Sequence, residues 1–186
     1  LSLHDLSRLD ALEAMLDAGI RSFKIEGRLK DADYVKNVVA AYSGRLNEVI
    51  ASHPGCWQRS SLGRSTINFT PDVERSFNRG FTSYFLQKPT PALRMSSMST
   101  PKFIGKKIGR IIRLLRPNTI EVQTTVSIAN GDGLGYFNAA GQFTGFRVNR
   151  VEGNRVYLAQ KVEGLTPGQV LYRNADKQFT DAIQRT

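Results

Sequence analysis

Three charged residues at alternate positions form the first group whose types and spacing suit chemistry. Lys24, Glu26 and Arg28 lie in the segment Ser22–Arg28. Because alternate side chains of an extended chain point to the same side, we expect Lys24 and Glu26 to share a face. Lys24 can bind an acidic substrate, Glu26 can transfer a proton or bind a metal, and Arg28 can bind a carboxylate or phosphate. We predict that the three are catalytic; the structural alternative is an ion pair at the rim of the fold.

A second polar pair, Asn78 and Arg79, stands between the aromatic residues Phe77 and Phe81. We predict that this pair binds substrate. The alternative is that it anchors a loop, with the Arg79 guanidinium donating hydrogen bonds to backbone carbonyl groups.

A third group consists of basic residues spread over 102–116. Its members are Lys102, Lys106, Lys107, Arg110, Arg113 and Arg116. Such a cluster favours nucleic-acid binding, because positive charge gives affinity for phosphates without sequence preference. Arg110 is two residues from both Ile108 and Ile112, so it is expected to share their strand face. Part of the cluster is therefore open to another reading, in which basic side chains extend from an apolar surface.

The elements that must position Lys24, Glu26 and Arg28 read as helix, strand and helix. Leucines at helical spacing predict a helix over 8–18, and Ile20–Ile25 reads as a strand. Asp33 is expected to cap the next helix, which ends near His53. This order is typical of an α/β fold, and polar residues at the carboxyl end of a barrel strand are usual active-site positions.

One strand cannot form a sheet alone. We therefore expect the chain to be the carboxy-terminal part of a larger enzyme, whose missing amino-terminal barrel supplies the neighbouring strands. If the edge at 20–25 stays exposed, copies of the chain are expected to associate through it.

The second half of the chain reads differently. Residues 87–101 are rich in Pro and Ser and are predicted to be a linker. Six short strands then follow, at 108–115, 119–124, 133–137, 145–151, 155–160 and 169–173. This spacing favours a small closed barrel. The predicted fold class is α+β, with the edge of an α/β barrel at 1–86, the linker at 87–101 and a basic β-barrel at 102–186.

Charge and cysteine content limit the function classes. The net charge is +10, and residues 102–186 hold 13 Lys and Arg against six Asp and Glu, so RNA is the expected partner; a merely basic, soluble surface is the alternative. Cys56 is the only cysteine, which excludes an internal disulfide and a multi-cysteine metal site and favours a reducing, cytoplasmic setting. No metal site is predicted. No apolar run approaches the roughly 20 residues that cross a bilayer, so no membrane partner is expected.

The segment Phe23–Arg28, followed by Asp33–Val35 and Val38–Tyr42, resembles the collagenase-like U-32 peptidase family. Phe77–Thr82 is similar to a second motif of that family, and Trp57–Arg64 is similar to the branch that makes 5-hydroxycytidine in 23S ribosomal RNA. Beyond residue 102 the chain resembles the family's carboxy-terminal barrel, which is itself similar to the second domain of translation factors.

The resemblance implies an α/β barrel with a cysteine cluster linked to an iron–sulfur centre, and prephenate as a metabolite of the RNA-hydroxylating members. That cysteine cluster is absent from this chain, so no cofactor is assigned within it and catalysis by the chain alone is not expected. The implied function is cytidine hydroxylation of 23S ribosomal RNA, with this chain supplying part of the active-site rim and an RNA-docking barrel. The alternatives are a peptidase and a non-catalytic module that binds protein or the ribosome.

Overall fold

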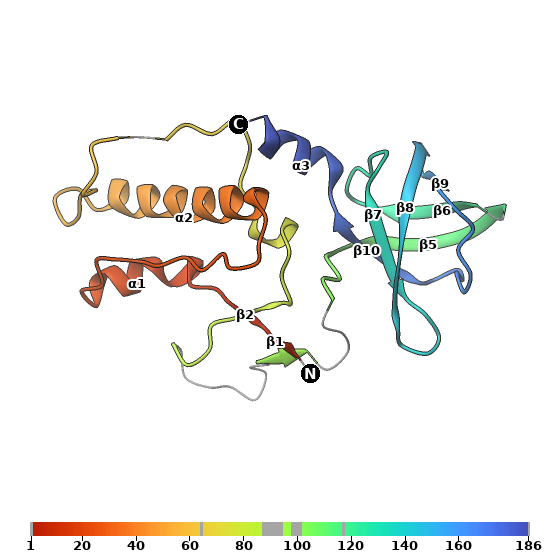
Figure 1. Ribbon diagram of the computed structural model, residues 1–186, viewed down its shortest axis with the longest axis horizontal. Coiled ribbons are helices and arrows are strands. Elements are labelled where there is room, and N and C mark those ends of the chain that lie inside the picture. The colour runs from red at the N-terminus through yellow and green to blue at the C-terminus, as the bar shows by residue number, and fades with distance from the viewer. Residues whose placement is uncertain (1, 64, 87–94, 98–101, 117, 186) are drawn as a thin grey trace.

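The computed structural model describes residues 2–63, 65–86, 95–97, 102–116 and 118–185. A helical part and a β-rich part lie at opposite ends of an elongated molecule, and the carboxy-terminal helix returns to the helical part (Figure 1). The helices are α1 (Leu12–Asp17), α2 (Ala32–Ser52) and α3 (Lys177–Gln184), with 3-10 turns at Leu9–Ala11 and Val73–Arg75. This mixed content confirms the predicted α+β class.

Helices α1 and α2 lie side by side and bury leucine and valine side chains. Leu12 and Val49 are fully buried between them. The predicted cap of α2 is wrong by two residues: Asp31 has an extended backbone, and its carboxylate accepts a hydrogen bond from the Tyr34 amide at 2.7 Å. Asp33 lies inside the first turn, where its own backbone is already helical. The end of α2 at His53 agrees with the prediction.

The predicted strand at 20–25 is wrong, since residues 20–27 form no strand in the part of the chain that the structure describes. Extended backbone becomes a strand only when a neighbour accepts and donates its hydrogen bonds. The strand pair of this region is instead the parallel pair of β2 (Asp5–Leu6) with β3 (Phe81–Thr82). Association of copies through segment 20–25 stays a prediction.

The predicted linker lies mostly outside the described residues. Of 87–101, only 95–97 are described, and they contain β4 (Ser96–Ser97), which pairs antiparallel with β1 (Ser2–Leu3). The boundaries proposed for the two parts of the chain stay predictions.

Six antiparallel strands close into a barrel, as the turn spacing predicts. They are β5 (Lys106–Arg116), β6 (Thr119–Thr124), β7 (Gly133–Phe137), β8 (Phe143–Glu152), β9 (Arg155–Leu158) and β10 (Val170–Ala175). Their order is β10-β5-β6-β9-β8-β7, and β7 pairs with β10 to complete the ring. One continuous core fills the barrel, with Leu134, Tyr136 and Val156 among its fully buried members.

The prediction that Arg110 shares a strand face with both Ile108 and Ile112 is wrong for Ile108 and right for Ile112. A register shift between β5 and β10 leaves Ile108 without an opposing residue, because Gly109 pairs with Leu171 and Lys107 with Tyr172. A bulge of this kind changes which side chains point inward. Ile108 is therefore buried in the core, whereas Arg110 is exposed with Ile112 on the outer surface.

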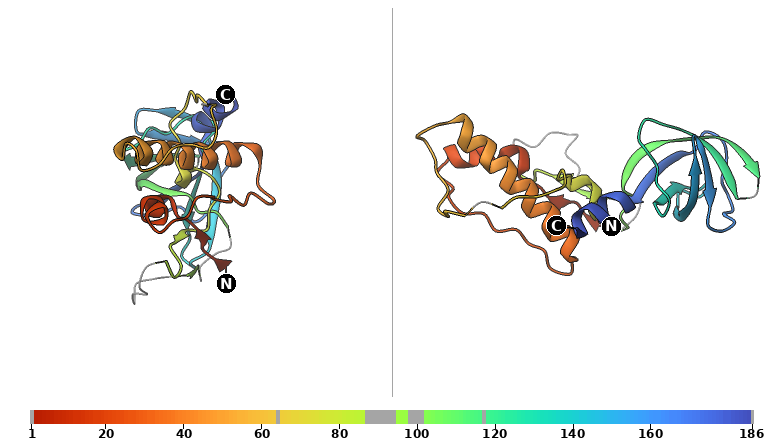
Figure 2. Two further views of the ribbon diagram at one scale, coloured as in Figure 1. Left: turned by 90° about the vertical axis from the view of Figure 1, so that its left-hand side faces the viewer. Right: turned by 90° about the horizontal axis from the view of Figure 1, so that it is seen from above.

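Helix α3 joins the two parts and was not predicted. In the right-hand view of Figure 2 it continues from the barrel toward α2. Phe179 and Ile183 are buried, and the Phe179 ring lies 6.1 Å from that of Phe69. The Gln184 amide donates to the Asp33 carboxylate at 2.7 Å. These contacts fix the barrel against the helical part.

Candidate functional site

A cleft of about 1070 Å³ lies where the helical part meets the barrel. Its walls come from 5–8, 22–34, 73–81 and 174–183, with Val38 and Tyr42 of α2, Met15 of α1 and Phe103 from the approach to β5. Four predicted site residues line it: Lys24, Glu26, Arg28 and Arg79. The structure thus brings together two groups that are some 50 residues apart in the sequence.

Lys24 and Glu26 form an ion pair at the mouth of this cleft. The Lys24 Nζ lies 3.4 Å from the Glu26 Oε2, and both side chains are largely exposed, at 87% and 68%. An exposed pair of this kind contributes about 0–1 kcal/mol to stability. Arg28 is also exposed on the cleft wall. The positive charges of Lys24 and Arg28 suit the binding of an anionic group, and the Glu26 carboxylate can accept a proton.

Asn78 and Arg79 have different local roles. The Asn78 amide nitrogen donates to the Ser76 carbonyl at 2.9 Å, and its Oδ1 accepts from the Gly80 amide at 3.1 Å, so this side chain holds its own loop. The Arg79 backbone amide donates to the Asp5 carboxylate at 2.9 Å, while its guanidinium lies 5.6 Å from the Phe77 ring centre. Arg79 lines the cleft and Asn78 is not among its lining residues. Substrate binding by the pair stays a prediction.

Sequence reasoning missed an aromatic wall of the cleft. The Lys30 Nζ lies 3.7 Å from the centre of the Phe77 ring, and Phe77 packs 5.8 Å from Phe103. A cation over a ring face is attracted by the ring quadrupole. Tyr34 borders the same space, where burial, and secondarily the charge of Asp5, raises the pKa of its phenol. The sequence gives little signal for this wall, because Phe77 and Phe103 meet only through the fold.

Several members of the basic cluster are held by partners. The Lys106 ammonium lies 2.6 Å from Glu74 in the helical part, and this hydrogen bond raises the pKa of Lys106. Arg110 donates to the Gln123 side chain at 2.9 Å, and Arg113 pairs with Glu121. The hydrogen bond from Arg113, followed by one from Asn154, lowers the pKa of Glu121.

The remaining members of the cluster are Lys102, Lys107 and Arg116. Lys102 and Lys107 are exposed. The side chain of Arg116 lies outside the described residues. Nucleic-acid binding by the six residues stays a prediction, and the structure makes Lys107 the member best placed for it, because its exposed side chain forms no ion pair among the described residues.

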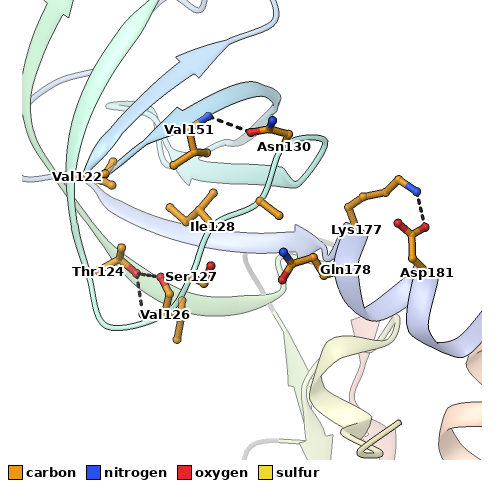
Figure 3. Close-up of a pocket in the computed structure, with 12 residues that line it drawn as sticks. Val122, Thr124, Val126, Ser127, Ile128, Asn130, Val151, Lys177, Gln178 and Asp181 are labelled. Atoms are coloured by element: carbon orange, nitrogen blue, oxygen red, sulfur yellow. Dashed lines mark hydrogen bonds and ion pairs between the residues drawn. The ribbon is translucent and has the colours of Figure 1, made fainter. Parts of the chain in front are cut away.

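A second pocket of about 570 Å³ lies at one end of the barrel (Figure 3). The loop after β6 and the first turn of α3 line it, with Ile128 and Val151 on its apolar side. Its polar groups have partners: Lys177 pairs with Asp181, and the Val151 amide donates to Asn130 at 3.0 Å. None of the predicted site residues lines this pocket.

Neither a metal-binding cluster nor a membrane-spanning helix occurs in the described part of the chain. No group of three or more His, Cys, Asp and Glu side chains gathers there with metal-binding geometry. Cys56 is exposed. No described helix is both long and apolar enough to cross a bilayer.

The family of the chain follows from its first half, which supplies most of the cleft wall. Residues 1–96 match the model of Peptidase family U32. The chain belongs to peptidase family U32. This confirms the resemblance seen in Phe23–Arg28 and Phe77–Thr82.

Curated relatives of this U32 chain extend the similarity into the barrel. It is 36% identical to the 23S rRNA 5-hydroxycytidine C2501 synthase of Escherichia coli (strain K12) across 100% of this chain and 29% of that protein. It is 30% identical to a collagenase of Porphyromonas gingivalis across 91% of this chain and 45% of that protein. The chain therefore spans less than half the length of these relatives.

Proposed function

We propose that this U32 chain serves cytidine hydroxylation in 23S ribosomal RNA, supplying part of an active-site rim and an RNA-docking barrel. The observation that carries the proposal is the 36% identity to a 23S rRNA 5-hydroxycytidine synthase over the whole chain. That similarity includes both the cleft and the basic barrel, and residues 102–186 carry the greater share of the net charge.

The cleft residues suit a role at such a rim. Lys24 and Arg28 can hold a phosphate or a metabolite carboxylate. Glu26 can accept a hydrogen bond from the amino group of a cytosine, which is the pairing that carboxylates make with this base. The exposure of all three favours contact with a large substrate over a structural role.

The family resemblance implies an iron–sulfur cluster and the metabolite prephenate. Iron–sulfur clusters are held by sets of cysteine thiolates, usually about four. Cys56 is the only cysteine and is exposed, so the residues of this chain do not fit such a cluster and no step is assigned to one. Prephenate carries carboxylates, and Lys24 and Arg28 are two of the cationic residues that line the cleft.

The helical part has an exposed apolar surface against which further strands of a longer protein can pack. Large apolar side chains around the parallel pair β2–β3 are exposed: Leu6 is 58% exposed, Phe85 59% and Leu29 97%. Leu29 also has a left-handed backbone, with φ of 61°. A parallel strand pair beside such a surface supports the expectation of an α/β barrel completed by further strands.

The test is rescue of cells that lack the full-length gene, with hydroxylated cytidine mapped in ribosomal RNA by mass spectrometry. The wild-type gene is expected to restore the modification, and a Lys24→Ala, Glu26→Ala, Arg28→Ala variant is expected to leave it at least about tenfold lower. The control is Lys161→Ala, Glu163→Ala, because this pair is also exposed and also two residues apart, at 3.7 Å. Unchanged cytidine on deletion would refute the proposal.

The collagenase relatives support a second candidate, a peptidase. It predicts hydrolysis of gelatin by the purified full-length protein, lost in a Glu26→Gln variant. A non-catalytic module would show neither activity. Its binding to an apolar protein partner would persist as salt rises, whereas RNA binding would weaken.

A further inference from the structure

The outer surface of the barrel over β10, β7 and β8 carries three aromatic rings. Alternation along each strand settles their direction, because neighbours such as Tyr136, Phe146 and Leu171 fill the core. Phe137 and Tyr172, which are adjacent to Tyr136 and Leu171, therefore point outward, and Phe143 shares the face of Phe137 because the two are cross-strand partners. The outward rings belong to Phe137, Phe143 and Tyr172.

The three rings touch one another and form one surface, which we name the aromatic face. Phe137 lies 5.3 Å from Phe143 and 5.8 Å from Tyr172, measured between ring centres, and Phe143 lies 6.2 Å from Tyr172. Tyr172 pairs with Gly135 across β10 and β7, and the Phe143 ring covers Gly135 so closely that a side chain there would overlap it. The rings are half-buried, so each has surface left for a ligand.

Two cations border the aromatic face. Lys107 is the cross-strand neighbour of Tyr172, and Arg147 is two residues along β8 from Gly145, the partner of Gly135. Both are exposed, and neither forms an ion pair or a side-chain hydrogen bond among the described residues. Strands β7 and β10 and residues 143–147 of β8 contain no Asp or Glu. The face therefore combines ring surface with positive charge.

The opposite side of the barrel lacks this combination. Tyr157 also points outward there, but Arg150 already lies over its ring at 4.3 Å. Glu152 accepts a hydrogen bond from the Tyr157 hydroxyl at 2.6 Å and pairs with Arg150 at 3.3 Å. A carboxylate beside the ring would repel a phosphate, so this tyrosine is a matched control.

We propose that the aromatic face binds single-stranded RNA, with unpaired bases on Tyr172 and Phe143 and phosphates at Lys107 and Arg147. The inference rests on the proposed RNA function and names the surface that carries it. Aromatic side chains accept any unpaired base, and flanking cations supply phosphate contacts. A duplex would present its phosphates but hide its base faces.

The experiment measures binding of the full 186-residue chain to a short labelled oligocytidylate, to an RNA duplex of equal length and to phosphatidylglycerol vesicles. Fluorescence anisotropy reports RNA binding, and thermal melting reports folding. Tyr172→Leu is expected to weaken single-strand binding about five- to tenfold, and Tyr157→Leu less than about twofold. Phe143→Leu is the second variant if Tyr172→Leu melts early, and it is expected to act in the same direction.

The outcomes separate the two proposals. If Tyr172→Leu and Phe143→Leu both leave salt-sensitive RNA binding intact, the aromatic face is not the binding surface. The proposed RNA function would still stand. Equal affinity for duplex and single strand would also overturn the face, because phosphates alone would then explain binding. Vesicle binding lost in Tyr172→Leu without any RNA binding would overturn both proposals.

Discussion

Arg75 of the helical part binds Asp176, the residue that caps the helix leaving the barrel. The Arg75 Nη2 lies 2.5 Å from the Asp176 Oδ2, and the same oxygen lies 2.9 Å from Arg173 of β10. Asp176 is only 5% exposed, and its other oxygen accepts from the Phe179 amide at 3.0 Å. One carboxylate therefore joins the family-matched half, the barrel and α3.

Replacing Asp176 should cost more stability than its single charge suggests. Asp176→Ala removes the cap and leaves two arginines without this partner, so we expect a loss of about 3 kcal/mol in the free energy of unfolding. Asp181→Ala removes only an exposed pair with Lys177 and should cost about 0.5 kcal/mol or less. Urea unfolding of both variants measures the difference. Equal losses of unfolding free energy would show that the buried contacts of Asp176 stabilise the protein no more than the exposed pair does.

Gly105 tests how closely the chain approaches the last barrel strand. A side chain at Gly105 would overlap the carbonyl oxygen of Arg173, and its φ is 76°. Gly141 has nearly the same backbone, φ 73°, with open space around it. Gly141→Ala should therefore cost about 1–2 kcal/mol from backbone strain, and Gly105→Ala at least about 3 kcal/mol. Similar losses in urea unfolding would attribute both to backbone conformation alone.

The barrel could be predicted from the sequence because its signals are local. Turn residues and alternation placed all six strands to within a few residues. The bulge at Ile108 could not be predicted, since it depends on how β10 pairs with β5. Strand formation at Ile20–Ile25 also depends on pairing. The composition of this segment suits a strand, but no described neighbour pairs with it.

The site also has residues that a local pattern predicts and contacts that only the fold creates. Lys24, Glu26 and Arg28 stood out because their spacing is short and their side chains reactive. The partners that hold Lys106 and Arg113 were not foreseeable, because Glu74 and Glu121 approach them through tertiary contacts and strand pairing. The aromatic face also needs the register of three strands, which no local pattern reveals.

Glu121 should make stability depend on acid pH. Its pKa is lowered in the folded state by the hydrogen bonds from Arg113 and Asn154. A lowered folded pKa gives stability that is present above the unfolded pKa, about 4.5, and is lost as pH falls through the folded pKa. Glu121→Gln should therefore shrink the drop in melting temperature between about pH 5 and pH 3. Parallel wild-type and variant curves would contradict this assignment.

Lys106 and Lys107 are adjacent in sequence but should differ in their effect on RNA affinity. Both side chains are exposed, but the Lys106 Nζ lies 2.6 Å from Glu74, whereas Lys107 lies beside Tyr172. Each phosphate contact to a single strand contributes about 0.7 to the slope of log affinity against log salt. Lys107→Gln should reduce that slope by about 0.7, and Lys106→Gln should leave it nearly unchanged because its charge is already neutralised by Glu74. Titrations with oligocytidylate at several salt concentrations measure both slopes. If Lys106→Gln lowers the slope as much as Lys107→Gln does, the Glu74 pair opens when RNA binds, and the phosphate path extends toward the cleft.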